Sequence, residues 1–343
     1  MRFHLILPGL LWPSQVLRDT AHDLPLPSLS WLLGRGNLRW QAPLPLEHWL
    51  CRESGCEQQP PPAAALRLLG EGGNPGQDIW ICVDPVHLQF QQGRPSLRGG
   101  SLDITADEMQ QLATALAPLF AELGEFRCGV PGHAYLKLRA LPKLQTPPPS
   151  AAIGRSHPLP GGPEAAQWRR LGNEAQMLLH ALPLNAQRET AGLPTINSLW
   201  FWGAGILPAR KPDPNPSYQR SVGRQSLQPG LAAWSGMAHS QDIADSATLL
   251  AQPQATQLLL DDLLAPTQQL DANAWRQVLL EIERSWLRPL QGALRSGRLQ
   301  HLRVTAMGEE TSFELSLSRA DTLKFWRRPK ALHELAGLLA APR

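Results

Sequence analysis

No stretch of the chain approaches the ~18 consecutive apolar residues that a membrane-spanning helix needs. The segment from Met1 to Leu11 is apolar but shorter than that, and no Ala-x-Ala cleavage signature follows it. It is therefore predicted to be a first buried strand rather than a signal peptide. These absences favour a cytoplasmic protein that does not bind a membrane.

Charge is also sparse. Asp, Glu, Lys and Arg make up 18% of the 343 residues, and the formal net charge is +3. The densest basic cluster is interleaved with aromatic residues: Lys324, Phe325, Trp326, Arg327, Arg328 and Lys330. Proteins that read nucleic acid usually carry a longer basic stripe. We interpret the cluster as a solvated C-terminal face, so the sequence predicts no nucleic-acid partner.

Cysteine is rare, with four copies at Cys51, Cys56, Cys82 and Cys128. The first two lie five residues apart, which differs from the C-x-x-C spacing of a zinc knuckle. Because no export signal is present, we expect structural thiols in a reducing cytoplasm.

What is present predicts an α/β protein in two parts. At about 150 residues per domain, the chain is long enough for two domains, and 43% of its residues are hydrophobic. Strands and helices alternate before and after a middle unit that reads strand–strand–helix–strand–strand. We therefore predict an α/β core with helices on both faces of its sheet, made of residues 1–76 and 145–343. A small α+β domain, residues 77–144, is predicted to be inserted into this core.

The expected elements follow from periodicity and from turn residues. Strands are predicted at 2–7, 79–83, 86–91, 126–128, 134–138, 196–202, 257–260, 302–306 and 313–317. Helices are predicted at 28–33, 44–50, 63–69, 105–121, 163–181, 227–234, 272–294 and 332–339. Thr105 is a suitable N-cap for its helix. The apolar run 196–202 reads as a buried strand of the α/β core sheet.

One segment carries a recognisable motif, Asn197-Ser198-Leu199-Trp200-Phe201-Trp202-Gly203-Ala204-Gly205. Pro183-Leu184-Asn185 with Arg188 precedes it, and Gly230-Leu231-Ala232 with Gly236-Met237 follows it. These segments resemble the motifs of archaeal-type cofactor-independent phosphoglycerate mutases. The resemblance covers most of the chain and implies an alkaline-phosphatase-like fold.

Two further segments indicate which family of this superfamily the chain resembles most. They are Pro8-Gly9-Leu10-Leu11-Trp12 and Trp80-Ile81-Cys82-Val83-Asp84-Pro85-Val86-His87-Leu88. Within the same superfamily they resemble the RpfE-type regulatory proteins of proteobacteria.

The mutase resemblance implies two divalent metals, which would clamp a phosphoryl group and need carboxylate and imidazole ligands. The family supplies an Asp-Gly after the first strand, an Asp-x-x-x-His, an Asp-His and a final His. Here Pro8-Gly9, Thr267 with Asp271, and Met307-Gly308 stand in the first three places. No histidine occurs at 316–319. The sequence therefore predicts no metal, no cofactor and no catalytic residue.

The prediction is thus a non-catalytic protein with a mutase-like fold and a regulatory or binding role. The alternative is a cofactor-independent phosphoglycerate mutase, or another phosphoryl-transfer enzyme, whose ligands lie elsewhere in the sequence. Their pool would be His4, Asp19, His22, Asp23, Asp261, Asp262 and Asp271. No Ser or Thr stands in a nucleophile motif, and the default candidates are Ser14, Thr20 and Ser28.

Asn185, Arg188 and Asn197 match family positions and are the candidates for a ligand site. Arg188 could grip a phosphate or carboxylate through two N–H groups, or it could pin a helix end to the sheet, and the two roles are equally favoured. Asp84 and His87 are interpreted as turn and strand residues rather than as an acid/base dyad. The predicted partner is either a protein or a phosphorylated small molecule.

Overall fold

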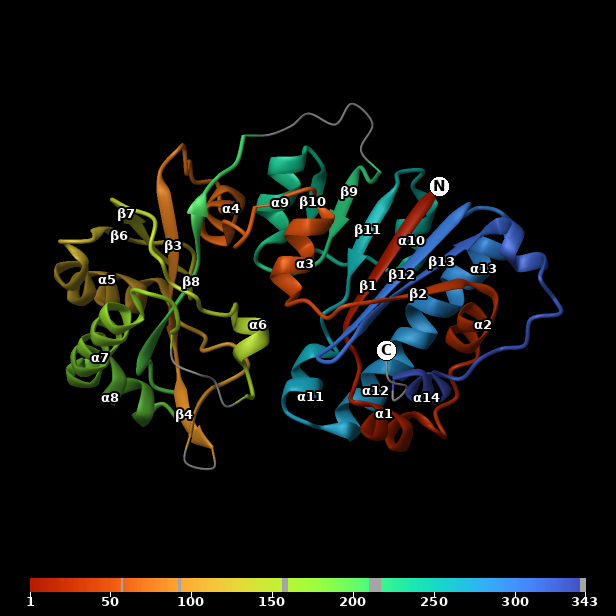
Figure 1. Ribbon diagram of the computed structural model, residues 1–343, viewed down its shortest axis with the longest axis horizontal. Coiled ribbons are helices and arrows are strands. Elements are labelled where there is room, and N and C mark those ends of the chain that lie inside the picture. Colours follow the sequence, from red (N-terminus) through yellow and green to blue (C-terminus); the bar gives the residue numbers. More distant parts are fainter. Residues whose placement is uncertain (57, 92–93, 156–159, 210–216, 340–343) are drawn as a thin grey trace. The chain divides into compact units, whose positions relative to one another are not determined.

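The computed structural model describes residues 1–56, 58–91, 94–155, 160–209 and 217–339 (Figure 1). The chain forms two compact units, each with its own sheet and core. The first unit comprises Met1–Leu44, Asp213–Gln228 and Gly236–Arg343, and the second comprises Pro45–Pro212 and Pro229–Ser235.

The first unit is built on a seven-stranded sheet of order β10-β9-β11-β1-β12-β13-β2. From β10 to β12 the neighbours run parallel, whereas β13 pairs antiparallel with both β12 and β2. The strands are β1 (Arg2–Leu11), β2 (Asn37–Gln41), β9 (Arg220–Val222), β10 (Ala238–Ser240), β11 (Thr256–Leu259), β12 (His301–Gly308) and β13 (Ser312–Ser318). β1 is buried along nearly its whole length because strands lie on both sides of it.

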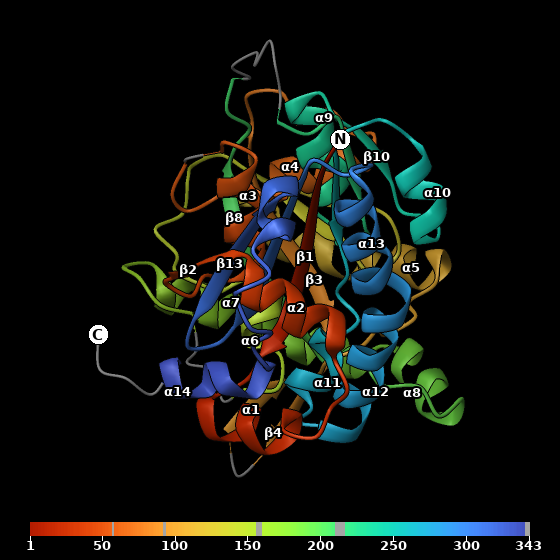
Figure 2. The ribbon, with the colours of Figure 1, turned by 90° about the vertical axis from the view of Figure 1, so that its right-hand side faces the viewer.

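One face of this sheet is apolar and covered by helices (Figures 1 and 2). Phe3, Leu5 and Leu7 of β1 lie on it, because alternate residues of a strand share a face. Leu302 and Val304 of β12 join the same core. The elements that cover it are α1 (Ser14–Ala21), α2 (Pro27–Arg35), α10 (Ser246–Ala251), α12 (Ala272–Ile282), η1 (Glu283–Leu287), α13 (Arg288–Ser296), η3 (Leu332–Glu334) and α14 (Leu335–Leu339).

The opposite face of the same strands is polar. His4 pairs in register with Gln257 on one side and Arg303 on the other, so the three side chains share this face. The Nε2 atom of His4 lies 2.9 Å from the hydroxyl oxygen of Thr305, and both residues are fully buried. Burial and the nearby Arg303 charge hold the pKa of His4 well below its usual value. The imidazole is therefore neutral at pH 7.

The second unit has a four-stranded antiparallel sheet of order β6-β7-β3-β8. Its strands are β3 (Ile79–Val86), β6 (Gly124–Cys128), β7 (Ala134–Leu138) and β8 (Ser198–Ile206). Helices α5 (Ala106–Phe120) and α7 (Ala165–Ala181) pack on it around Phe120, Trp168 and Phe201. The other elements are α3 (Leu46–Glu53), α4 (Ala63–Gly70), β4 (Leu88–Gln91), β5 (Arg94–Leu97), α6 (Pro149–Ala152), α8 (Pro183–Thr190) and α9 (Gln228–Ser235).

The predicted α/β class is confirmed, and so is the cap of α5. The hydroxyl of Thr105 accepts a hydrogen bond from the N–H of Glu108, whose carboxylate accepts the N–H of Thr105 in return. The predicted helix at 272–294 is interrupted by the π-helical segment η1. There the buried Glu283 accepts the N–H groups of Ser28 and Leu29 at the start of α2, where such groups have no partner within the helix.

The strand predicted at 196–202 exists as β8, but its assignment to the core sheet is wrong. β8 pairs antiparallel with β3, with Phe201 opposite Val83. A continuous apolar run signals burial on both faces and does not reveal the partner strand. The second unit also extends beyond the predicted insertion 77–144, because β8 and α7 complete its sheet and core.

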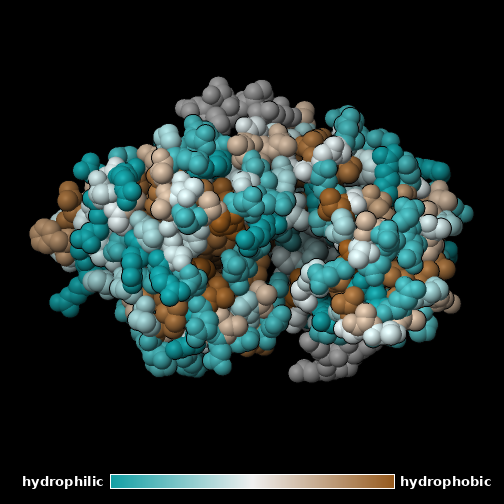
Figure 3. Space-filling view, turned by 180° about the vertical axis from the view of Figure 1, so that it is seen from behind, coloured by the Kyte–Doolittle hydropathy of each residue, from teal (hydrophilic) through white to brown (hydrophobic). Residues whose placement is uncertain are grey.

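Short elements escape the sequence patterns, since a few residues cannot display a period. They include α1, α8, α10, α11 (Leu264–Gln268), β2, β5, β9 and β10. Within the described ranges no helix is long and apolar enough to cross a membrane. Figure 3 shows apolar residues scattered among hydrophilic ones over the face that it presents.

Candidate functional site

The carboxyl end of β1 is the place where the resemblance puts the first metal ligand. The pairing of β1 with β12 is irregular between Pro8 and Leu11, and such a bulge tolerates a proline. Gly9 has φ +82°, and a Cβ atom added there would lie 2.7 Å from the carbonyl oxygen of Leu263. Both the backbone angle and the space therefore require glycine.

Three side chains close over this strand end, and we call them the Trp–Thr cluster: Trp12, Thr267 and Trp275. The carbonyl oxygen of Gly9 accepts hydrogen bonds from the Trp275 indole and from the Thr267 hydroxyl, each at 2.9 Å. The Trp12 indole donates to the Thr267 hydroxyl oxygen, also at 2.9 Å. The two indole rings lie 5.6 Å apart, and Trp275 is fully buried. The strand end is therefore filled by packed, mutually bonded side chains.

No protein-family model matches the chain, and no curated protein sequence matches it. Among the solved structures that resemble it, two are matched over nearly their whole length. A cofactor-independent phosphoglycerate mutase from Thermoplasma acidophilum DSM 1728 is 18% identical at a TM-score of 0.52, covering 100% of this chain and 95% of that chain. The PH0037 protein from Pyrococcus horikoshii is 13% identical at a TM-score of 0.53, covering 97% and 92%. The fold is phosphoglycerate-mutase-like and of the alkaline-phosphatase type.

The residues at the positions where the resemblance implies metal ligands do not fit a divalent cation. An indole N–H is only a donor, and the Thr267 hydroxyl already contacts Gly9 and Leu263 as well as Trp12. Met307, at the Asp-His position, is a buried thioether. Across the described ranges, no three His, Cys, Asp or Glu residues are grouped so that they could hold a metal.

Asp271, at the expected histidine position, caps a helix. It is the N-cap residue of α12, and its carboxylate accepts the N–H of Ala274 at 2.9 Å. A carboxylate at a helix N-terminus is stabilised by the helix dipole, which explains an aspartate here without a metal.

The remaining carboxylates and histidines of the alternative pool fall in three separate places. His4 lies within β1, bonded to Thr305. Asp19, His22 and Asp23 surround the exposed end of α1, and Asp23 pairs with Arg276 at 2.6 Å. Asp261 and Asp262 follow β11. Burial and the neighbouring Asp262 charge raise the pKa of Asp261.

The default nucleophile candidates are also dispersed. Ser14 begins α1, Thr20 lies near its end, and Ser28 is buried in the first turn of α2. The carbonyl oxygen of Thr20 accepts a hydrogen bond from Arg276 at 2.6 Å. Since these residues stand in three different settings, no common nucleophile site emerges from them.

Asn185 and Asn197 hold backbone groups of the second unit. The Asn185 amide donates to the carbonyl oxygens of Leu179 and Ile196 and accepts the N–H of Ile196. The Asn197 amide bonds both the N–H and the carbonyl of Leu88, at 2.7 and 2.8 Å. Both amides thus supply hydrogen-bond partners to backbone N–H and carbonyl groups at points where the chain leaves a helix or a strand.

Arg188 is fully buried and links α8 to neighbouring segments. Its Nε donates to the carbonyl of Pro194 at 2.7 Å, and its Nη1 bonds the Glu108 carboxylate at 2.9 Å. Its Nη2 donates to the carbonyl of Leu102. Each of its three nitrogens has a protein acceptor, so this geometry favours the pinning role over the grip on an anion.

Asp84 and His87 belong to different hydrogen-bond networks. The carboxylate of Asp84 receives two bonds from Arg67, at 2.6 and 2.8 Å, and one from the Trp202 indole at 2.7 Å. Burial alone would raise the pKa of Asp84, but the Arg67 charge holds it below its usual value. His87 instead contacts the carbonyl oxygen of Thr195 at 2.8 Å.

The Arg67 network continues toward the surface through Tyr135. The Nε of Arg67 donates to the Tyr135 hydroxyl, which donates to Glu71, and Glu71 also contacts His133 at 2.6 Å. The Arg67 guanidinium lies 4.8 Å from the Tyr135 ring. Since Arg67 and Asp84 pair with each other and the Glu71 carboxylate accepts the Tyr135 hydroxyl, the network can hold β3 and β7 to α4 without a ligand.

Proposed function

We propose that this chain is a non-catalytic protein on the phosphoglycerate-mutase scaffold, with a regulatory or binding role like that of the RpfE-type proteins its motifs resemble. The observation that carries the proposal is the Trp–Thr cluster at the carboxyl end of β1. It stands where the family's chemistry requires cation ligands.

The physical reason is electrostatic. Phosphoryl transfer requires positive charge on the transferring group and an activated nucleophile, and the mutase family obtains both from its two metals. Two indoles, a hydroxyl and a thioether bring no anionic ligand to the strand end, so a divalent cation there would lose its hydration without compensation. Thr267, which stands where the family has an aspartate, is hydrogen-bonded to Gly9 and Trp12, which supports a structural role for it.

The alternative function is a phosphoryl-transfer enzyme with relocated ligands. One observation favours it: Asp261 and Asp262 follow β11, which lies beside β1, and Asp261 is partly buried with a raised pKa. Perturbed carboxylates at strand ends are frequent in active sites. Within the described ranges no third His, Cys, Asp or Glu is grouped with these two carboxylates, so they are a weaker basis than the filled strand end.

The test uses the purified full-length chain. Metal content is measured by elemental analysis, and conversion of 3-phosphoglycerate is followed in a coupled assay with Mg²⁺, Mn²⁺, Co²⁺ or Zn²⁺ added. We expect metal far below one equivalent and no conversion above the blank. Stoichiometric metal, or EDTA-sensitive conversion that Asp261→Asn abolishes and Asp242→Asn leaves intact, would establish the alternative, because Asp242 is exposed and lies outside the ligand pool.

A further inference from the structure

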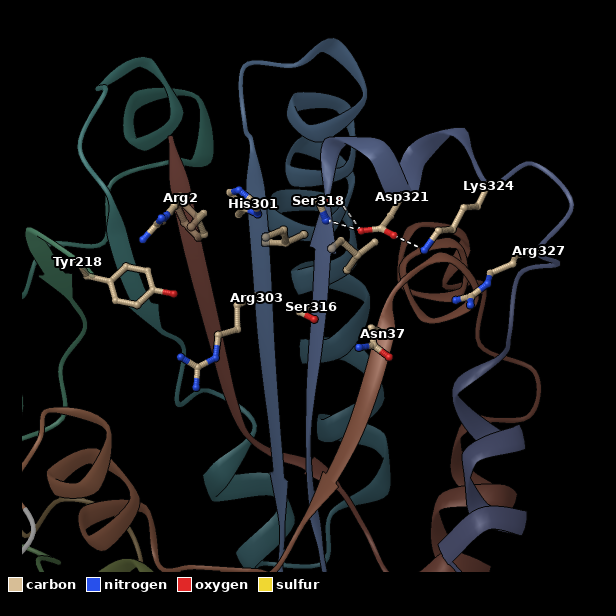
Figure 4. A pocket seen from close by; sticks show the side chains of 13 residues that line it. Arg2, Asn37, Tyr218, His301, Arg303, Ser316, Ser318, Asp321, Lys324 and Arg327 are labelled. Atoms are coloured by element: carbon tan, nitrogen blue, oxygen red, sulfur yellow. Dashed lines mark hydrogen bonds and ion pairs between the residues drawn. The ribbon is translucent and has the colours of Figure 1, made fainter. Parts of the chain in front are cut away.

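A basic cavity of about 470 Å³ opens at the amino ends of β1 and β12, within the first unit (Figure 4). It lies at the opposite end of β1 from the Trp–Thr cluster. Gly9 follows Arg2 by seven positions along the strand, which at ~3.3 Å per residue is ~23 Å. The cavity is therefore separate from the position of the family's metals.

Strand register builds the floor of the cavity. Arg303 of β12 is opposite Ser316 of β13, and Ser316 is opposite Asn37 of β2. Paired residues point to the same face, so a guanidinium, a hydroxyl and an amide form one row. Figure 4 shows these three side chains on the near face of the sheet, with Tyr218 beside them. Tyr218 packs against His4, with ring centroids 5.6 Å apart.

A second row forms the rim. Arg2 of β1 is opposite His301 of β12, and His301 is opposite Ser318 of β13. Lys324 and Arg327 complete the lining on the side of β13 and β2. The side chains of Arg2 and His301 make no hydrogen bond or ion pair with another described residue.

Positive charge exceeds negative charge around the cavity. Four obligatory cations line it, Arg2, Arg303, Lys324 and Arg327, against one carboxylate, Asp321. Asp321 is bonded to Ser318 and Lys324, and a second carboxylate outside the lining, Glu314, pairs with Arg303 at 2.6 Å. Four cations minus these two carboxylates leaves an excess of two positive charges.

We propose that this cavity binds a phosphate-bearing ligand. Guanidinium groups bind phosphate oxygens through paired N–H donors, and the Ser316 hydroxyl and the Asn37 amide add neutral donors beside them. The volume is in the range of small-molecule sites. The inference rests on the proposed binding role and gives it a site and a ligand class.

The mouth of the cavity leaves two sources for such a ligand. Three apolar residues neighbour Lys324 and Arg327 in the sequence. They are Leu323, Phe325 and Trp326, whose exposed fractions are 72%, 81% and 67%. A soluble phosphorylated compound would use the charged and polar side chains of the floor and the rim alone. A phosphorylated lipid headgroup would use the floor while the exposed apolar side chains enter the membrane surface. Both kinds of ligand would present phosphate oxygens to the same side chains of the cavity floor.

The test measures binding to the full-length chain without added metal. Inorganic pyrophosphate is titrated by calorimetry at 50 mM salt, and co-sedimentation is measured with phosphatidylcholine vesicles with or without a phosphorylated inositol lipid. Arg2→Glu and Arg327→Glu change two exposed rim residues that lie outside the core, so we expect both variants to fold. Arg18→Glu is the matched control, because Arg18 is exposed on α1 and its substitution changes the net charge equally.

We expect saturable binding of one probe, weakened at least about tenfold by each rim variant and less than about twofold by Arg18→Glu. Pyrophosphate binding identifies a soluble ligand, and binding only to the phosphorylated vesicles identifies a headgroup. Absence of binding to both probes, or equal loss in Arg18→Glu and Arg2→Glu, would overturn the inference. Because this experiment measures binding and not turnover, its outcome is independent of the test of catalysis.

Discussion

The two ends of the parallel strands in the first unit differ in chemistry. At the carboxyl end, the Trp–Thr cluster covers the backbone of Gly9 with buried, hydrogen-bonded side chains. At the amino end, Arg2 and Arg303 line an open basic cavity. In open α/β sheets the carboxyl end is the usual position of the ligand.

The difference indicates that the fold can be kept while the side chains of a functional site change. The strands β1 and β12 keep their parallel pairing, which depends on backbone hydrogen bonds and on alternating apolar residues. The side chains beyond the strand ends do not contribute to that pairing, so they can exchange metal ligands for packing residues while the fold persists. We expect the carboxyl end to contribute to stability and the amino end to contribute to binding.

The largest expected effect is the loss of Trp275. Trp275→Ala removes a fully buried indole that packs on Trp12 and donates to the Gly9 carbonyl, and the expected loss is about 3–5 kcal/mol in the free energy of unfolding. Urea denaturation measures it. Arg2→Ala at the amino end is the control and should stay within about 0.5 kcal/mol of the unsubstituted protein. Equal losses of unfolding free energy in both variants would contradict the expectation that the carboxyl end contributes more to stability than the amino end.

A smaller effect is expected from Thr267→Val, which keeps the shape and removes the hydroxyl. The buried Trp12 indole then lacks its acceptor, and Gly9 loses one of two donors, so the free energy of unfolding should fall by about 1–3 kcal/mol. The matched control is Thr114→Val, because Thr114 also bonds the carbonyl four residues earlier but is exposed on α5. A loss in Thr114→Val as large as that in Thr267→Val would assign the effect to the helix rather than to the strand end.

The sequence reveals part of this contrast. The resemblance to the mutases implies metal ligands at the positions of Pro8, Thr267 and Met307, and the sequence shows residues there that bind metals poorly. The cluster that replaces them is not visible, since Trp12 and Trp275 are far apart in the chain and meet only in the folded unit. Their aromatic type predicts burial but not the partner.

The amino-end cavity escapes sequence reasoning for a related reason. Arg2, Arg303 and Arg327 are dispersed along the chain, and only strand register and the turn after β13 bring them to one cavity. The signal that was available is the alternation within β12, where Arg303 and Thr305 interrupt the apolar residues of the other face. Such alternation predicts a polar face, but it does not say which residues of other strands complete it. The assignment of β8 to the core sheet is wrong for the same reason, because the pattern of a strand does not reveal its partner strands.

The smallest and most specific expected effect concerns pH and His4, which lies between the two ends on the polar face. Its pKa in the folded chain is well below the value of about 6.5 for an unfolded chain. Below pH 6.5 the unfolded state therefore binds more protons than the folded state, and stability falls as pH falls. The contribution is complete above pH 6.5, and the slope attributable to His4 reaches about 1.4 kcal/mol per pH unit below it.

Urea denaturation from pH 7.5 to 5 measures this slope in the unsubstituted protein and in His4→Gln. The variant loses stability at every pH because the buried contact with Thr305 changes, but it should lose the additional slope that His4 causes. His22→Gln is the control, because His22 is exposed on the same unit and its loss should leave the slope in place. An unchanged slope in His4→Gln would mean that the imidazole takes up its proton within the fold, and that the polar face is open to water between the filled end and the basic end.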